Sequence, residues 1–428
     1  MLENFKNKTI LIVGMGKSGQ SVARFCLKHS IHFVAYDDKL TDTVHYKILN
    51  HVDQIFGWNG NAVHSIDIVV QSPGINGLIH PVIGFAKSKN IPVWSDLDLF
   101  NQCRDHSIPC IGITGTNGKS TTTSLVAHIL NDHLKQENSE KYAYVGGNIG
   151  VPVLDLLDEE EQNKVAFYVL ELSSYQLDIA LQITLDIALF LNISADHIDY
   201  HGSFEAYQLA KEKIFASAKF SIKPTDLLIT EDIKTLQKNC HLRGEHNLQN
   251  MQAAYLIGKH LGLNQNQIYE AMKTFIGIEH RQEIVVENDK WIVINDSKAT
   301  NADATETALK AFKKHPVFLM LGGIVKEGGI LSLKSYLKDV ERIYLIGQAQ
   351  EMFLSQLKSM EIDDDKVVEC CTLEKAVEES LKDIQQFEMC DVKPVLLFSP
   401  ACASFDQFLN FEDRGQQFKE FIKKGLSE

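Results

Sequence analysis

Residues 112–123 read GITGTNGKSTTT, and the rest of the chain is organised around this stretch. An apolar run, 108–113, precedes it and a helical pattern, 121–130, follows it, so its glycines lie at a turn between a strand and a helix. Gly115 and Gly118 allow backbone N–H groups to converge on an anion, and the helix N-terminus adds the positive end of its dipole. The stretch therefore predicts a phosphate-binding loop.

The lysine and hydroxyls at the end of this loop indicate a nucleotide with its metal ion. We expect Lys119 to reach the β and γ phosphates and the hydroxyl of Ser120 or Thr121 to bind Mg2+. The common P-loop pattern has a glycine where Ile113 stands, so this loop is shorter than the usual form. The alternative is a glycine turn with a surface lysine, but the strand before GKST and the helix after it favour nucleotide binding.

Length, composition and charge restrict the class of protein. The 428 residues exceed what one hydrophobic core serves, so we expect two or three domains. No apolar run approaches the roughly 18 residues of a membrane span, and the first residues lack the order of a signal peptide, so we expect no membrane and a cytoplasmic location. The net charge of −14 disfavours nucleic acid, and eight cysteines without a CxxC pair predict reduced thiols.

The N-terminal region has a second glycine turn. The strand pattern 9–13 runs into GMGKSG at 14–19 and a helical stretch, and the next strand, 32–36, ends in Asp37 and Asp38. This GxGxxG arrangement suggests NAD, but any nucleotide diphosphate uses the same turn, so nicotinamide is not specified. A third strand, 66–71, ends just before Ser72 and Gly74. A fourth strand, 91–94, completes a small α/β unit that ends near residue 96.

Polar residues follow the strands around the phosphate-binding loop. Strand 165–170 ends in Glu171, and strand 187–191 ends in Asn192, shortly before His197. Because the ends of parallel strands face one crevice, we expect Glu171 and His197 to serve Mg2+ chemistry, although each alone is compatible with a solvated carboxylate or a core histidine. Periodicity in helix 203–218 places Lys211 on a solvent-facing side.

A helix and a group of four strands complete the chain. Helix 248–261 is expected to have Asn247 as its cap and Asn250 in its first turn. After Arg281, strands 291–294, 317–321, 343–346 and 395–398 each end in small or polar residues, which predicts a third α/β domain.

Taken together, the motifs resemble those of the Mur ligase family. They are ITGTNGKST, VGGNIG at 145–150, LELSSYQL at 170–177, LNISADHIDYH at 191–201, GEHNLQN at 244–250, EHRQE at 279–283, NDSKATN at 295–301 and SPACAS with 410–415. The loop and the HN and HR motifs are shared across the superfamily, which includes folylpolyglutamate synthase. NDSKATN and SPACASFDQF are similar to the D-glutamate-adding branch.

The resemblance implies three α/β domains and an ATP-dependent ligase of peptidoglycan synthesis. The domains are a Rossmann-like UDP-binding domain at 1–96, a central P-loop ATPase domain at 97–278, and a Rossmann-like amino-acid-binding domain at 279–428. The implied reaction joins D-glutamate to UDP-N-acetylmuramoyl-L-alanine through an acyl phosphate, releasing ADP and phosphate. A monomer acting on these small molecules is expected.

The resemblance also implies roles for individual residues. The ATP set is Gly115, Thr116, Asn117, Gly118, Lys119, Ser120, Thr121, Asn250, Arg281 and Asp296. Catalysis and two Mg2+ ions involve Lys119, Ser120, Glu171, His197 and Lys211, the last matching a lysine that the family carbamylates. The UDP set is Lys17, Ser18, Asp37, Asp38, Lys39, Ser72 and Gly74, and Asn148, Ser173 and Gln176 face the muramoyl-alanine arm. The D-glutamate set is Lys298, Thr300, Lys326, Ser404 and Phe411.

Related enzymes differ from this chain at two places. They often carry threonine and arginine where Asp38 and Lys39 stand, and aspartate and glycine where Ile324 and Val325 stand. Three other functions stay open at this point: another amide ligase of the superfamily, an NAD-dependent oxidoreductase using the first glycine turn, and a nucleotide-binding switch without ligase chemistry. The oxidoreductase leaves Glu171, His197 and Lys298 without a task, and the switch needs only one of the polar loops.

Overall fold

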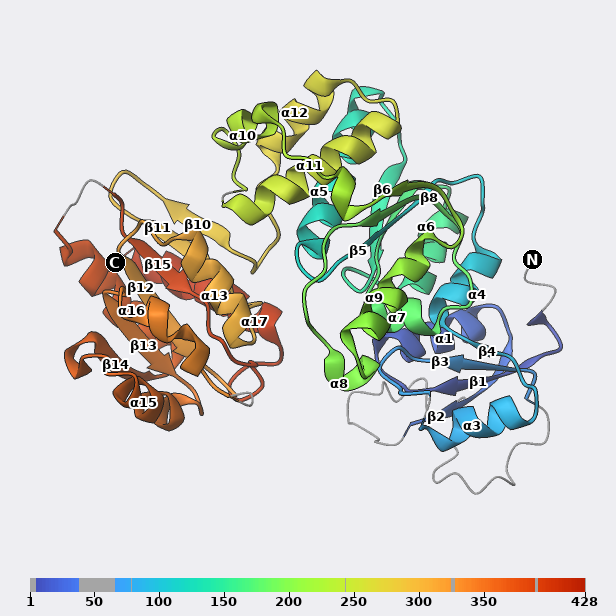
Figure 1. Ribbon diagram of the computed structural model, residues 1–428, viewed down its shortest axis with the longest axis horizontal. Helices are drawn as coiled ribbons and strands as arrows, with labels where there is room; N and C mark the ends of the chain where they lie inside the picture. The colour runs from blue at the N-terminus through green and yellow to red at the C-terminus, as the bar shows by residue number, and fades with distance from the viewer. Residues whose placement is uncertain are drawn as a thin grey trace. The chain divides into compact units, whose positions relative to one another are not determined.

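In the part of the chain that the structure describes, the strands form three sheets (Figure 1). The computed structural model describes residues 5–37, 66–77, 79–242, 244–324, 328–388 and 392–427. Backbone contacts divide the chain into two compact units, Met1–Cys240 with His246–Phe275, and His241–Glu245 with Ile276–Glu428. Asp38, Lys39 and Lys326 lie outside the described residues.

The N-terminal sheet is parallel, with the strand order β2-β1-β3-β4. Its elements are β1 (Thr9–Val13), α1 (Lys17–Lys28), β2 (His32–Tyr36), β3 (Ile68–Gln71), α3 (Pro81–Ser88), β4 (Val93–Trp94) and α4 (Asp96–Cys103). Val13 is in register with both Tyr36 and Gln71, so three strands end together beside the glycine turn. These strands are short and almost wholly apolar because helices cover both faces of a parallel sheet.

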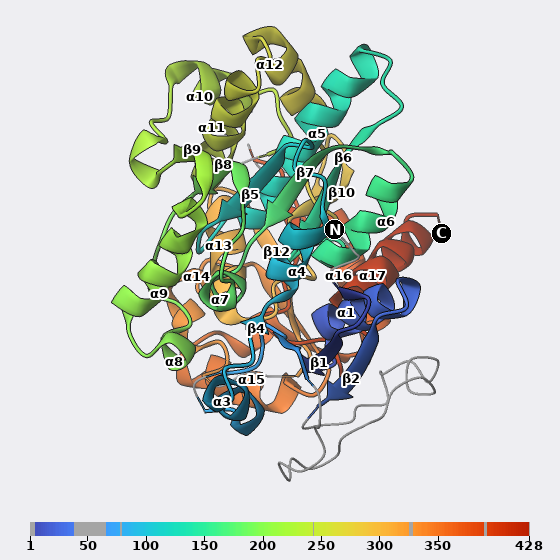
Figure 2. The same ribbon diagram turned by 90° about the vertical axis from the view of Figure 1, so that its right-hand side faces the viewer.

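The second sheet is also parallel, and its order β6-β7-β5-β8-β9 puts the strand before the phosphate-binding loop at the centre. Its strands are β5 (Cys110–Thr114), β6 (Tyr142–Gly147), β7 (Val165–Glu171), β8 (Leu185–Phe190) and β9 (Ala218–Ile222). The helices are α5 (Lys119–Gln136), α6 (Leu156–Glu161), α7 (Ser174–Ile179), α8 (Ile198–His201), α9 (Phe204–Glu212), α10 (Glu231–Gln237), α11 (Glu245–His260) and α12 (Gln265–Thr274). α12 packs along α5, as both ribbon views show (Figures 1 and 2).

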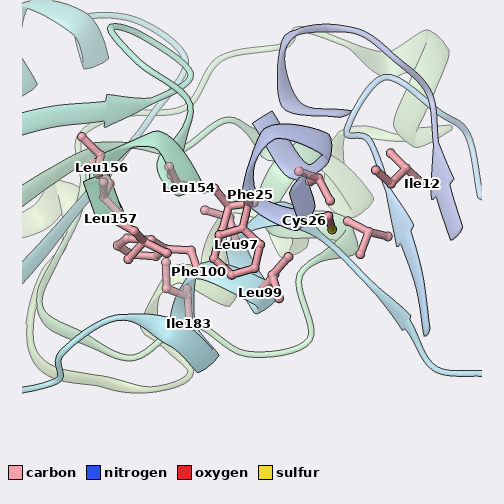
Figure 3. Close-up of a cluster of buried hydrophobic side chains, with 14 of the residues drawn as sticks. Ile12, Phe25, Cys26, Leu97, Leu99, Phe100, Leu154, Leu156, Leu157 and Ile183 are labelled. Atoms are coloured by element: carbon pink, nitrogen blue, oxygen red, sulfur yellow. The ribbon is translucent and has the colours of Figure 1, made fainter. Parts of the chain in front are cut away.

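One hydrophobic core joins the first two sheets into a single unit. Phe25 of α1, Phe100 of α4 and Leu156 of α6 are buried together (Figure 3). Polar contacts reinforce this core, since Asp155 accepts hydrogen bonds from Ser21 at 2.8 Å and from Arg24 at 2.7 Å. α4 begins at the expected boundary near residue 96 and belongs to this shared core, so the division at 96 stays a prediction.

The third sheet is mixed, with the order β10-β11-β15-β12-β13-β14 and an antiparallel edge strand, β10. Its strands are β10 (Glu283–Glu287), β11 (Ile292–Asn295), β12 (Val317–Gly322), β13 (Arg342–Ile346), β14 (Val367–Cys371) and β15 (Val395–Phe398). The helices are α13 (Ala302–Ala311), α14 (Lys334–Leu337), α15 (Gln350–Ser359), α16 (Leu373–Gln386) and α17 (Phe411–Gly425). α13, α14 and α15 cover one face and α16 and α17 the other.

The expected α/β class and the expected strands are confirmed, and two local expectations are wrong. The helix expected over 203–218 ends at Glu212, a 3-10 turn follows, and Ala218 begins β9. α11 begins at Glu245, so Asn247 lies inside the helix and accepts a hydrogen bond from Asn250 there. In the part of the chain that the structure describes, no helix is both long and apolar enough to cross a membrane.

Candidate active site

The phosphate-binding loop joins the central strand β5 to the long helix α5. Gly118 has a φ of +81°, and a Cβ added there would lie 2.2 Å from Asn250 Oδ1. Gly115 has a φ of +158° and packs on Leu191 and Asn192. A side chain at Gly118 would clash and one at Gly115 would have little room, which fits the glycine turn of a phosphate-binding loop.

The side chains at the start of α5 are held near this loop. Lys119 Nζ donates hydrogen bonds to Gly115 O at 2.9 Å and to Thr116 O at 2.8 Å, so the ammonium lies over its own loop. Ser120 and Thr121 are buried in the first helical turn. Their hydroxyls therefore belong to the loop and not to the protein surface.

Glu171 ends β7, the strand that pairs with β5 in register Ile113 to Glu171. The carboxylate is buried, and Oε1 accepts a hydrogen bond from Asn148 Nδ2 at 2.7 Å. Among the described residues, Oε2 has no hydrogen-bond partner although it is buried. A buried carboxylate oxygen without a partner is costly unless a cation or a donor completes it, so Glu171 fits a metal ligand.

His197 lies between the loop and a group of aromatic rings. Its backbone is left-handed, with a φ of +52°, and Nδ1 lies 3.0 Å from Tyr175 Oη. Nε2 lies 3.4 Å from Asp196 Oδ2. The Tyr207 ring meets the His197 ring edge-to-face, and Tyr207 Oη lies 3.0 Å from Thr116 Oγ1. Within the described ranges, no three His, Cys, Asp or Glu side chains converge as a metal cluster.

Lys211 is buried, so the expectation of a solvent-facing side chain is wrong. Its exposed fraction is 1%, its Nζ donates to Gly115 O at 2.7 Å, and it lies 4.8 Å from the centre of the Tyr207 ring. Burial, followed by the nearby charge of Lys119, lowers the pKa of Lys211 to about 7. Periodicity missed this because it treats a lysine as polar without knowing that α9 packs against the loop.

Two residues expected to face the muramoyl-alanine arm form a helix cap. Ser173 caps α7, where its Oγ accepts from Gln176 N at 3.2 Å and donates to Gln176 Oε1 at 3.1 Å. Asn148 is occupied by Glu171 as described above. The structure thus places Asn148 directly after β6, and Ser173 and Gln176 at the start of α7 shortly after β7, with local hydrogen bonds already made.

The N-terminal glycine turn is closed by its own neighbours. A Cβ at Gly19 would lie 1.9 Å from Gly14 O, which accepts a hydrogen bond from Ser72 Oγ at 2.7 Å. Asp37 Oδ2 accepts from Met15 N at 2.6 Å. The structure therefore brings Ser72 and Asp37 to the turn.

The other residues expected at this turn surround it less closely. Lys17 begins α1, whose N-cap Gly16 has no side-chain cap bond. Ser18 hydrogen-bonds the buried Asp96, whose pKa is raised to about 6 by burial. Apart from its chain neighbours, no atom of the described residues lies within 4 Å of the Cβ position of Gly74.

The other nucleotide-binding candidates fall in both units. Asn250 contacts the loop through Gly118, and its Oδ1 accepts from Thr122 Oγ1 at 3.2 Å. In the second unit, Asp296 is buried and accepts from Ser399 Oγ at 2.8 Å and from Gln282 N at 3.1 Å. Burial raises the pKa of Asp296 to about 7, although the Ser399 hydrogen bond and the charge of Arg281 oppose this rise.

Of the expected D-glutamate residues that the structure describes, Lys298 and Thr300 follow β11, Ser404 follows β15, and Phe411 begins α17. Lys298 Nζ lies 5.5 Å from the centre of the Phe411 ring, and Thr300 N donates to Lys298 O at 2.9 Å. Ser404 is buried. The structure therefore brings Lys298 and Phe411 together.

The sequence reasoning missed the residues that support these loops. Arg414 is fully buried and donates to Ser297 O at 2.7 Å and to Cys402 O at 3.0 Å. Asn192 contacts the phosphate-binding loop in the same supporting way, and Gln249 in turn accepts a hydrogen bond from Asn192. The only available signal was the position of each inside a motif, LNISADH, GEHNLQN or the segment 410–415.

The fold and the site define a class of protein: one with a P-loop ATPase-like central domain and a further α/β sheet before and after it in the sequence. Three family models match the chain: a Mur ligase MurD-like N-terminal domain over 8–95, a Mur ligase middle domain over 113–232 and a Mur ligase glutamate ligase domain over 280–396. The chain belongs to the Mur ligase family.

Relatives and solved structures agree with this membership. The chain is 35% identical to the UDP-N-acetylmuramoylalanine–D-glutamate ligase of Rickettsia prowazekii, covering 98% of this chain and 99% of that protein. The enzyme of the same name from Zymomonas mobilis is 33% identical, with 98% of each chain covered. The crystal structure of the UDP-N-acetylmuramate-alanine ligase of Thermotoga maritima has a TM-score of 0.56 at 17% identity, covering 98% of this chain and 100% of that one, and shows a shared fold.

Proposed function

We propose that this chain is an ATP-dependent ligase that joins D-glutamate to UDP-N-acetylmuramoyl-L-alanine in peptidoglycan synthesis. The observation that carries the proposal is the glycine loop at 115–118 beside Glu171 of the neighbouring strand, whose buried Oε2 has no hydrogen-bond partner in the described part of the chain. Relatives named UDP-N-acetylmuramoylalanine–D-glutamate ligase match nearly the whole chain, which supports the substrate pair. An oxidoreductase or another ligase of the superfamily is not favoured by these matches.

The chemistry needs a phosphoryl donor because a carboxylate and an amine do not condense in water. The muramoyl-alanine carboxylate attacks the γ-phosphorus of ATP, ADP leaves, and an acyl phosphate forms. The amine of D-glutamate then attacks the acyl carbon, phosphate leaves, and the amine loses one proton. The backbone N–H groups of Gly115, Gly118 and the start of α5 would hold the phosphates, whereas those of Thr116 and Asn117 are paired with Asn192 and would shape the loop. Lys119 would leave its carbonyl partners to neutralise the charge that develops on the phosphates.

Magnesium fits the donor set beside this loop. Glu171 Oε2 is buried and has no hydrogen-bond partner within the described ranges, and carboxylate and hydroxyl oxygens are ligands that Mg2+ prefers. Ser120, Glu171, His197 and a modified Lys211 would hold two ions. When bound, the ions would neutralise phosphate charge and orient the reacting oxygens.

Carbamylation of Lys211 is part of the proposal. Its pKa of about 7 leaves a large share of the amine neutral near neutral pH, and only the neutral amine adds to carbon dioxide. The Nζ lone pair forms the N–C bond and one proton leaves to solvent. The product is a buried carbamate anion, which changes the side chain from a cation into an oxygen ligand.

The substrate groups are assigned to separate parts of the chain. Residues 1–96 would bind the UDP moiety, through Lys17, Ser18, Asp37, Asp38, Lys39, Ser72 and Gly74, and residues 97–278 would bind ATP. Residues 279–428 would bind D-glutamate through Lys298, Thr300, Lys326, Ser404 and Phe411. Arg281 and Asp296 would complete the nucleotide site. We also propose a cytoplasmic monomer, the compartment being that of ATP and of nucleotide-linked precursors.

The test is ADP release by the purified protein with ATP and Mg2+. We expect release only when D-glutamate and UDP-N-acetylmuramoyl-L-alanine are both present, and no release with L-glutamate in place of the D isomer. Lys119→Ala serves as the inactive control. Equal turnover with L-glutamate, or with the acceptor of another Mur ligase, would overturn the substrate assignment.

A further inference from the structure

A single asparagine side chain holds the middle of the phosphate-binding loop. Asn192 Oδ1 accepts from Asn117 N at 2.9 Å, and Asn192 Nδ2 donates to Asn117 O at 3.1 Å. Its backbone oxygen also accepts from Thr116 N at 2.9 Å. Asn192, two residues after the end of β8, thus pairs with both backbone groups of Asn117, as a residue of a neighbouring strand would.

A second amide supports the first. Gln249 Oε1 accepts from Asn192 Nδ2 at 3.1 Å, and Gln249 Nε2 donates to Leu191 O at 3.2 Å. Gln249 stands next to Asn250, which contacts Gly118. The first turns of α11 therefore support the loop from outside, through two adjacent side chains.

The loop has a physical reason to need this support. Gly115 and Gly118 are the residues that lose most conformational freedom when the loop is ordered. The loop is also shorter than the common P-loop, and backbone amides that bind phosphate work best when they already point at it. Asn192 takes up the N–H groups of Thr116 and Asn117, and Gln249 holds Asn192, so the N–H groups of Gly115, Gly118 and the start of α5 are the ones we assign to phosphate.

We propose that Asn192 and Gln249 are positioning residues that fix the 115–118 loop in its phosphate-binding conformation before nucleotide arrives. The inference rests on the proposed nucleotide site. It assigns these amides no contact with phosphate; they act through the backbone of Asn117. Their loss should weaken nucleotide binding and leave D-glutamate recognition unchanged.

The chain contains a matched control for this role. Asn131, farther along α5, makes the same pair of bonds to Ala143, accepting from its N at 2.7 Å and donating to its O at 3.1 Å. Asn131→Ala thus removes the same two hydrogen bonds from the edge strand β6. It should affect stability much as Asn192→Ala does, without touching the loop.

The experiment measures ADP binding by calorimetry and hydrogen exchange of the peptide covering 112–123 for full-length wild type, Asn192→Ala, Gln249→Ala and Asn131→Ala. We expect Asn192→Ala to bind ADP roughly ten- to a hundredfold more weakly and to exchange faster in the ligand-free loop. Gln249→Ala should show a smaller change in the same direction, and Asn131→Ala should bind ADP normally. The Michaelis constant for D-glutamate should change in none of them.

The outcomes separate this inference from the proposed function. Normal ADP affinity and loop exchange in Asn192→Ala would overturn the inference, as would equal losses in Asn131→Ala. If Asn192→Ala does not fold, Gln249→Ala decides by the same two measurements. A wild type that binds ADP but does not require D-glutamate for turnover contradicts the proposed function and leaves this comparison decisive. Failure of wild type to bind ADP contradicts both.

Discussion

Replacing Asp296 with asparagine should stabilise the second unit while weakening ATP binding. The carboxylate is 4% exposed, and its pKa is raised from 3.8 to about 7 by burial. Such a rise means that the folded state holds the proton more tightly than the unfolded state does. The free energy of unfolding therefore falls as the pH rises from about 4 to about 7, and the full decrease is about 4 kcal/mol.

The amide introduced by Asp296→Asn can keep both hydrogen bonds. Its oxygen can accept from Gln282 N, and its nitrogen can donate to Ser399 Oγ, whose own hydrogen can turn to Thr305 Oγ1 at 3.2 Å. The change therefore removes a buried charge and keeps both hydrogen bonds. We expect equal stability of variant and wild type near pH 4, and a gain of about 2–4 kcal/mol for the variant at pH 8.

Urea unfolding at several pH values measures this gain. Trp291 is buried in the same unit and reports its unfolding, in a background where Trp58 and Trp94 are replaced by phenylalanine. Calorimetry with ATP measures the loss of affinity, which we expect to be about tenfold or more. A stability difference that does not grow with pH, or a variant less stable than wild type at pH 8, would refute the argument from burial.

Three further predictions concern charged side chains. Lys119→Ala should lower turnover by roughly three powers of ten or more, because it removes the charge aimed at the transferring phosphoryl group; steady-state ADP release measures this, and a loss below tenfold would contradict it. Lys211→Ala should abolish most turnover and recover part of it with added acetate or another small carboxylate, whereas normal activity without additive would exclude a carbamate. Lys326→Ala should raise the Michaelis constant for D-glutamate by about one to two powers of ten and leave that for ATP unchanged; a change confined to ATP would show that the loop at Ile324 and Val325 serves another purpose.

The strands were readable from the sequence because strands buried on both faces are continuous apolar runs, as in residues 9–13 and 317–321. Strands without that property were missed. β9 is half exposed, and β10 is an antiparallel edge strand whose residues are only partly buried. Their pairing depends on neighbours far away in the chain.

The candidate site was readable where a residue follows a strand or a glycine turn. Glu171 was expected at the crevice because β7 had to end there, and the structure places it beside β5. Lys211 was misplaced because its burial depends on the packing of α9 against Gly115. Asn192 and Gln249 were missed because their pairing joins two motifs that only the folded chain brings together. The catalytic roles themselves stay predictions.

The support of the loop by α11 also has a consequence for the order of synthesis. The ribosome makes β5, the loop and α5 early, but Asn192, Gln249 and Asn250 emerge much later, and Gln249 and Asn250 follow residues 241–245, which belong to the other unit. A nascent chain that ends before α11 has the central sheet but lacks Gln249 and Asn250, which support the phosphate-binding loop. Contacts so distant in the chain form late in folding. Such a fragment should form its sheet but should not bind ATP. The protein should therefore begin to bind ATP only when α11 has been synthesised and has packed against the loop.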